Sequence, residues 1–161
     1  MTPVARWLWL AFWIFACFAV AGVSGASTAR EVTGWYRTLV RPGFAPPNWV
    51  FGPVWSLLYL LMAIAAWRVT VVPTSPLRNW AIALFVAQLA LNYAWSWLFF
   101  SLHQIGLALA EVVLLWLAIL VCTVVFRRIS PLAAGLMTPY LAWVTFASFL
   151  NGGFWWLNRH G

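Results

Sequence analysis

Long apolar segments separated by short polar stretches run through this chain of 161 residues. Five stretches between the charged positions are uncharged or nearly so: residues 7–29, 42–67, 79–102, 104–126 and 129–158. Each can supply the roughly 20 residues with which a helix crosses a bilayer. The pattern predicts helices at about residues 5–25, 47–70, 78–101, 104–127 and 131–157, joined by tight turns and one long loop, residues 26–46. We therefore expect an all-α, polytopic membrane protein: a single five-helix bundle.

Composition supports this fold class. Hydrophobic residues make up 65% of the chain and charged residues 7%, whereas a soluble domain carries roughly 25% charged residues. The chain is therefore expected to be an integral, multi-pass membrane protein. Its net charge of +7 comes from arginines near the ends of the apolar segments, which favours contact with lipid headgroups and excludes nucleic acid as a partner.

The most unusual local sequence is the stretch 35–59, WYRTLVRPGFAPPNWVFGPVWSLLY, where a loop enters an apolar segment. Its prolines fix φ and stiffen the chain, and several aromatic side chains add bulk. These residues are Pro42, Pro46 and Pro47 together with Trp35, Tyr36, Phe44 and Trp49. A rigid aromatic loop at the mouth of an apolar bundle favours a cap over a site for a flat, hydrophobic ligand, and the alternative is an interfacial aromatic belt.

Three predicted helices carry stripes of aromatic or amide side chains at helical spacing. The stripes are Trp55, Tyr59 and Met62; Gln88, Asn92, Trp95 and Phe99; and Tyr140, Trp143, Ala147, Leu150 and Phe154. One such stripe is more often core packing than a ligand site, but three facing a common interior below the loop favour a cavity. For Gln88 and Asn92, hydrogen bonds between helices and contact with a ligand remain equal alternatives.

Few residues suggest other chemistry. Glu111 is the acid inside a predicted span, and its place near the end of that span is compatible with either an anchor or a ligand contact. His103 and His160 have no second histidine or carboxylate at ligand spacing, so we expect no metal site.

Several motifs together resemble one known family. They are Trp35-Tyr36, Pro42, Pro46-Pro47, Trp49, Gly52, Trp55 and Tyr59, then Gln88, Asn92 and Trp95, and finally Pro139-Tyr140, Trp143 and Leu150-Asn151. In this order they resemble the translocator protein family, whose members are also called tryptophan-rich sensory proteins or peripheral benzodiazepine receptors. The resemblance implies a five-helix bundle, often a homodimer, in a bacterial envelope membrane or the mitochondrial outer membrane. It also implies binding of tetrapyrroles such as protoporphyrin IX or haem, and of isoquinoline and benzodiazepine drugs, with no cofactor required.

The resemblance and the stripes together identify the expected site residues. Ligand contacts are expected from Pro46, Phe51, Trp55, Tyr59, Asn92, Trp95, Trp143, Ala147 and Leu150, and the cap, with cations for ligand propionates, from Trp35, Arg37 and Arg41. One departure concerns sterols, to which animal members are linked. Gly152 stands where the animal sterol motif has a tyrosine, so sterol binding is not expected to match porphyrin binding.

The sequence is compatible with two other function classes and also predicts an assembly. Some bacterial members of the family degrade protoporphyrin in light, which would make Trp55 and Trp143 catalytic, whereas a structural scaffold would have no ligand.

Pairs of alanines at four-residue spacing allow close helix approach: Ala83 with Ala87, and Ala90 with Ala94. They predict a homodimer through this helix, unless they pack inside the monomer.

Overall fold

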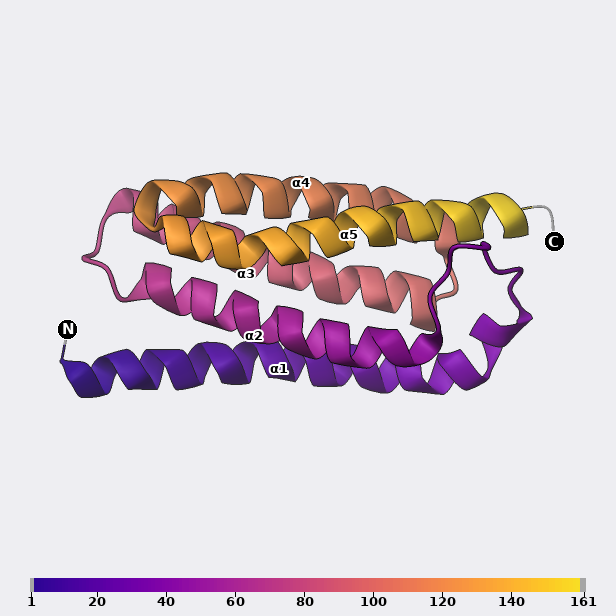
Figure 1. The fold of residues 1–161 in the computed structure, drawn as a ribbon, viewed down its shortest axis with the longest axis horizontal. Helices are drawn as coiled ribbons and strands as arrows, with labels where there is room; N and C mark the ends of the chain where they lie inside the picture. The colour runs from indigo at the N-terminus through magenta and orange to yellow at the C-terminus, as the bar shows by residue number, and fades with distance from the viewer. Residues whose placement is uncertain (1, 160–161) are drawn as a thin grey trace.

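The computed structural model describes residues 2–159, so His160 lies outside the described part. Five long helices form an elongated bundle (Figure 1): α1 (Pro3–Thr33), α2 (Phe51–Thr70), α3 (Pro76–Ser96), α4 (Ile105–Ile129) and α5 (Pro131–Asn158). Two 3₁₀ turns, η1 (Trp35–Thr38) and η2 (Asn48–Val50), lie between α1 and α2, and a π-helical turn, η3 (Trp97–Ser101), follows α3. All five helices are long and apolar enough to cross a membrane. The predicted all-α membrane bundle is confirmed.

Local sequence explains where three of the helices begin. At α1, α3 and α5 a proline occupies the first helical position, where its missing N–H costs nothing. The preceding hydroxyl side chain accepts a hydrogen bond from a backbone N–H of the first turn. These capping residues are Thr2, Ser75 and Ser130.

The first helix differs from the prediction. Expected to end near residue 25, it continues to Thr33, so the long loop begins at Gly34. Gly25 does not end the helix, because glycine is common in membrane helices and the next residues, ASTAREVT, contain no proline. The helix ends at Thr33, and the N–H of the next residue, Gly34, donates a hydrogen bond to the carbonyl of Glu31. The other helices begin and end within about one turn of their predicted bounds, except that α3 ends at Ser96 and the π-helical η3 continues the chain to Ser101, where the helix was expected to end.

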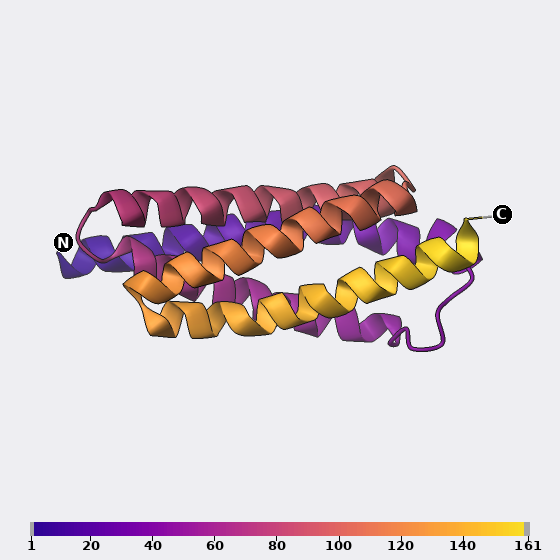
Figure 2. The same cartoon turned by 90° about the horizontal axis from the view of Figure 1, so that it is seen from above.

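The helices pack in a closed order that differs from their order in the chain. α1 packs on α2, α2 on α5, α5 on α4 and α4 on α3, and α3 returns to α1. Both views show the start of α1 and the end of α5 at opposite ends of the bundle, with the long loop beside the end of α5 (Figures 1 and 2). The main apolar core fills the middle of the bundle and the end opposite the long loop. A second, mainly aromatic cluster, which includes Tyr36, Phe99 and Phe154, lies under the loop.

Candidate functional site

A cavity of about 530 Å³ opens inside the loop end of the bundle. This volume falls within the range of sites that hold small molecules and cofactors. Its described walls come from α1, α2, α3 with η3, and α5, and Tyr36 and Asn48 lie at the loop. Within residues 2–159 the lining contains no charged side chain.

The predicted ligand contacts converge on this cavity with one exception. The lining includes Phe51, Trp55, Tyr59, Asn92, Trp95, Trp143, Ala147 and Leu150. Pro46 is not part of the described lining, and its carbonyl oxygen instead accepts a hydrogen bond from Arg41. The three stripes therefore face one space, although each comes from a different helix.

One entire wall was missed by the sequence analysis. α1 contributes small side chains at helical spacing: Ala21, Ser24, Gly25, Thr28, Ala29 and Val32. The spacing was a usable signal, but half of these residues lie beyond the point where the helix was expected to end. Small residues also lack the aromatic character by which the other stripes were recognised.

Asn92 connects three helices at the floor of the cavity. The Tyr59 hydroxyl on α2 donates to Asn92 Oδ1, and Asn92 Nδ2 donates to the Tyr140 hydroxyl on α5 at 3.0 Å. Asn92 thus both lines the cavity and holds the helices together. Gln88, one turn earlier, is fully buried, is not part of the described lining, and has no hydrogen-bond partner for its amide among the described residues. Neither hydrogen bonding between helices nor contact with a ligand is therefore assigned to it.

Indole rings form the aromatic wall. The Trp55 ring lies 6.5 Å, centroid to centroid, from each of the Trp95 and Trp143 rings. Trp95 Nε1 donates to Asn151 Oδ1 at 3.1 Å, while Asn151 Nδ2 donates to the Ile105 carbonyl, so the Trp95 ring is held in place. Trp143 Nε1 is buried without a hydrogen-bond partner among the described residues, which leaves this indole N–H as a donor for a ligand.

The cap over the cavity is Tyr36. Its side chain is 4% exposed and packs against Phe99, Phe100 and Phe154. The Arg41 guanidinium lies 5.6 Å from the centre of the Tyr36 ring. Burial raises the pKa of the Tyr36 phenol, and the positive charge of Arg41 offsets part of that rise. Tyr36 therefore covers the site as a neutral aromatic group.

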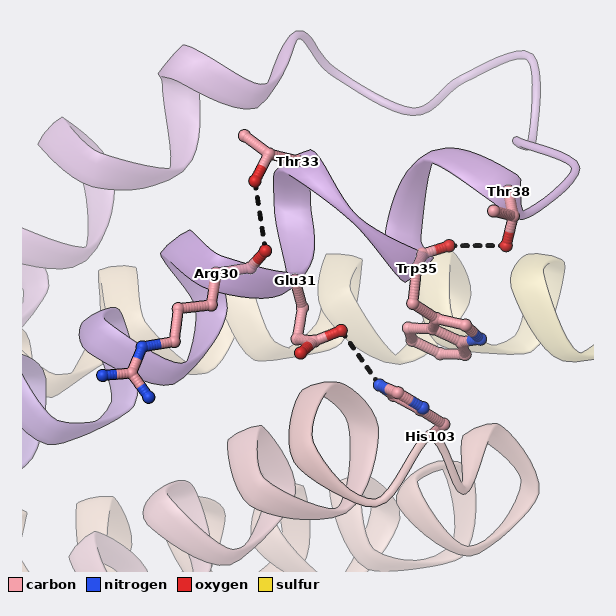
Figure 3. Close-up of polar contacts among 6 residues, drawn as sticks. All are labelled: Arg30, Glu31, Thr33, Trp35, Thr38 and His103. Atoms are coloured by element: carbon pink, nitrogen blue, oxygen red, sulfur yellow. Dashed lines mark hydrogen bonds and ion pairs between the residues drawn. The ribbon is translucent and has the colours of Figure 1, made fainter.

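Trp35, which was expected in the cap, lies beside the cavity and is not among its described lining residues. Its ring stacks on the His103 ring with centroids 4.1 Å apart, and His103 Nε2 lies 3.0 Å from Glu31 Oε2 (Figure 3). His103 has a φ of 57°, which turns the chain sharply between α3 and α4. These three side chains fasten the end of α1 to that turn, beside the cavity and outside its described lining.

The two arginines of the predicted cap also lie outside the lining. Arg41 donates to Asn48 Oδ1 at 3.1 Å and to the Pro46 carbonyl at 2.9 Å, so it braces the loop. Arg37 is exposed. Glu111 is half-buried on α4, a helix that contributes nothing to the described lining, so no ligand contact is assigned to it.

Comparison with known proteins gives one consistent result. Residues 13–157 match the model of the TspO/MBR family. The chain is 38% identical to the tryptophan-rich protein TspO of Chlorobaculum tepidum, over 89% of this chain and 92% of that protein. It is 40% identical to the translocator protein of Homo sapiens, over 79% and 76% of the two chains. It is also 37% identical to the tryptophan-rich sensory protein of Cereibacter sphaeroides, over 89% and 88%.

Proposed function

Because this chain belongs to the TspO/MBR family, we propose that it binds a planar hydrophobic ligand of the tetrapyrrole class, such as protoporphyrin IX or haem, inside the membrane. The observation that carries the proposal is the cavity of about 530 Å³ at the loop end of the bundle, walled by indole rings. Apolar walls bury a flat macrocycle, and a few polar groups orient it. Isoquinoline and benzodiazepine drugs share this flat, apolar character and belong to the same proposal, and no cofactor is required.

Two polar positions support this choice of ligand. The unpartnered Trp143 N–H can donate to a ligand oxygen. The Arg41 guanidinium lies next to the cavity, because it donates a hydrogen bond at 3.1 Å to Oδ1 of Asn48, a lining residue. A propionate at the mouth can take over that bond as a charge-assisted pair. Sterols are left out of the proposal, because Gly152 carries no side chain to recognise them.

The direct test is a titration of the purified protein in lipid vesicles with protoporphyrin IX, followed by quenching of tryptophan fluorescence. Saturable quenching with a defined stoichiometry is expected, since Trp55, Trp95 and Trp143 line the site. A structural scaffold without a ligand site would show no saturation. Its quenching would rise linearly with the amount of porphyrin that partitions into protein-free vesicles of the same lipid.

Exchange of the Trp143 side chain tests whether the protein does more than bind. We expect Trp143→Phe to weaken protoporphyrin IX binding by about three- to tenfold, because phenylalanine keeps an apolar wall and removes one hydrogen-bond donor. If binding is the whole function, the rate at which illuminated porphyrin loses its absorbance will not depend on this indole. Both quantities are measured on the same vesicles.

The controls are free porphyrin and an unrelated membrane protein, since porphyrins bleach unaided in light and oxygen. A native rate far above both controls that collapses in Trp55→Phe and in Trp143→Phe, with binding retained, would favour the light-dependent enzyme over the binding protein.

The assembly proposal concerns the outer face of α3. Ala83, Ala87 and Ala90 are exposed and Ala94 is half-exposed, so the first three do not pack inside the monomer. We expect Ala87→Leu to shift the detergent-solubilised protein from homodimer toward monomer, because the larger side chain separates closely approaching backbones. Mass measured by light scattering checks this, with Ala110→Leu on the exposed face of α4 as the matched control. An unchanged mass in Ala87→Leu would contradict this interface.

A further inference from the structure

We infer that ligands reach the cavity sideways from the bilayer, through a portal between α1 and α2 lined by Gly25, Ala29, Gly52 and Ser56. This inference rests on the proposed function and adds the route and the character of the ligand. A route through lipid selects molecules that partition into the membrane before they meet the protein.

The first observation is the exposure of the cavity walls. Among the described lining residues, the exposed ones are these four, two on α1 and two on α2. Lining residues contributed by α3 with η3 and by α5 are buried or half-buried. The cavity therefore meets the outside where α1 and α2 face each other, on a surface that lies within the membrane-spanning segments.

The second observation is the space between the two helices. Small residues at a membrane helix interface normally bring the backbones into contact. Here a Cβ atom built on Gly25 or on Gly52 meets no described atom within 4 Å. At the other end of the bundle the same helices are joined firmly, for example by Trp13 Nε1 donating to Thr70 Oγ1 at 2.9 Å. Gly25 on α1 and Gly52 on α2 thus border open space at the level of the cavity.

The chemistry of the portal suits an apolar ligand. The Ser56 hydroxyl donates to the Gly52 carbonyl at 2.9 Å, and the Thr28 hydroxyl behind the portal donates to the Ser24 carbonyl. The Ser56 and Thr28 hydroxyls are thus paired with carbonyls of their own helices, so neither presents an unpaired donor to a passing ligand. Nor is there a charged side chain in the described lining whose desolvation would oppose entry.

The third observation is that the aqueous end is closed. The Asn158 side chain accepts from the Val40 N–H at 2.9 Å and donates to the Val40 carbonyl at 3.0 Å, which pins the loop to the end of α5. Next to it the loop lies directly on the helix, because a Cβ on Gly153 would come within 2.8 Å of Pro42 Cγ. Tyr36 fills the space below.

The portal lies just inside the membrane boundary. Trp49, which is 74% exposed, precedes Gly52 by one turn and has the position of an interfacial anchor. On α1, Arg30 follows Gly25 by about 7.5 Å along the helix axis. An amphipathic planar ligand at this depth keeps its polar edge near the headgroups while its ring system slides between the helices.

The experiment compares the rates of binding and release. Protein in phosphatidylcholine vesicles is mixed rapidly with protoporphyrin IX, and tryptophan quenching is followed; release is measured by dilution into excess empty vesicles. The double variant Gly25→Leu/Gly52→Leu is expected to bind and to release the porphyrin about tenfold more slowly, because a narrower portal slows passage in both directions. Both leucines can be accommodated, because the positions are open.

Matched controls are Gly22→Leu and Gly135→Leu, which are exposed, have no described atom within 4 Å of the new Cβ and do not belong to the described lining. They are expected to keep native rates, and so is Asn158→Ala, which loosens the loop. Native rates of binding and release in the double variant would overturn the portal. Slow binding with an unchanged release rate would also overturn it, because that result means that the leucines fill the cavity and do not narrow a route into it. Faster exchange in Asn158→Ala alone would assign entry to the aqueous end. If the native protein shows no saturable quenching, the proposed function itself fails, a result distinct from these.

Discussion

An Ala147→Phe variant should lose protoporphyrin IX binding by about 100-fold while remaining folded. Ala147 is 7% exposed and lies on the face of α5 that lines the cavity with Trp143 and Leu150. A phenyl ring on this Cβ extends into the cavity and occupies volume that the macrocycle needs. Because the cavity is already empty space between the helices, the added ring fills it and does not displace packed core.

The affinity is measured by the quenching titration, and the folded state by the thermal transition in the same detergent. Ala142→Phe is the matched control, since Ala142 is exposed on α5 and is not part of the described lining; it should bind as the native protein does. Retained affinity in Ala147→Phe would show that the porphyrin binds elsewhere.

Replacing Asn92 with Leu should lower the free energy of unfolding by about 1–3 kcal/mol. Asn92 accepts from the Tyr59 hydroxyl and donates to the Tyr140 hydroxyl, and all three side chains are buried. Leucine leaves both hydroxyls without these partners in an apolar environment. The cost arises from the unpaired groups more than from the loss of the bonds themselves.

A triple variant separates these two causes. Tyr59→Phe/Asn92→Leu/Tyr140→Phe contains no unpaired group of the network, so it should recover most of the stability lost by Asn92→Leu. Asn79→Leu, at an exposed amide on the same helix, serves as the control and should change stability little. Thermal unfolding in a fixed detergent measures all the variants. A triple variant as unstable as Asn92→Leu would contradict this account.

Much of the site could be predicted because helical periodicity is a local property. Trp55 and Tyr59 share a face of α2, and Trp143, Ala147 and Leu150 share a face of α5, whatever surrounds them. Apolar length likewise determines that the segments span a membrane as helices, since a backbone in hydrocarbon must satisfy its own hydrogen bonds. Fold class and the inward-facing stripes are therefore properties of the sequence alone.

The functions of individual polar and loop residues depended on distances between elements far apart in the chain. Asn92 reaches two tyrosines because α2, α3 and α5 converge around it, while Gln88 on the same stripe does not reach the cavity. Trp35 and Tyr36 are neighbours in sequence, yet one stacks on His103 and the other covers the site. No periodicity distinguishes such pairs.

The sequence by itself determined five membrane helices and the faces that turn inward, because both follow from residue spacing within one segment. The tertiary structure decided that α1 runs on to Thr33 and forms a wall, that Arg41 braces the loop, and that Gly25 and Gly52 border open space beside the cavity. Small residues allow helices either to touch or to separate. Which of the two occurs is set by the packing of the other helices and by the loop that spans them.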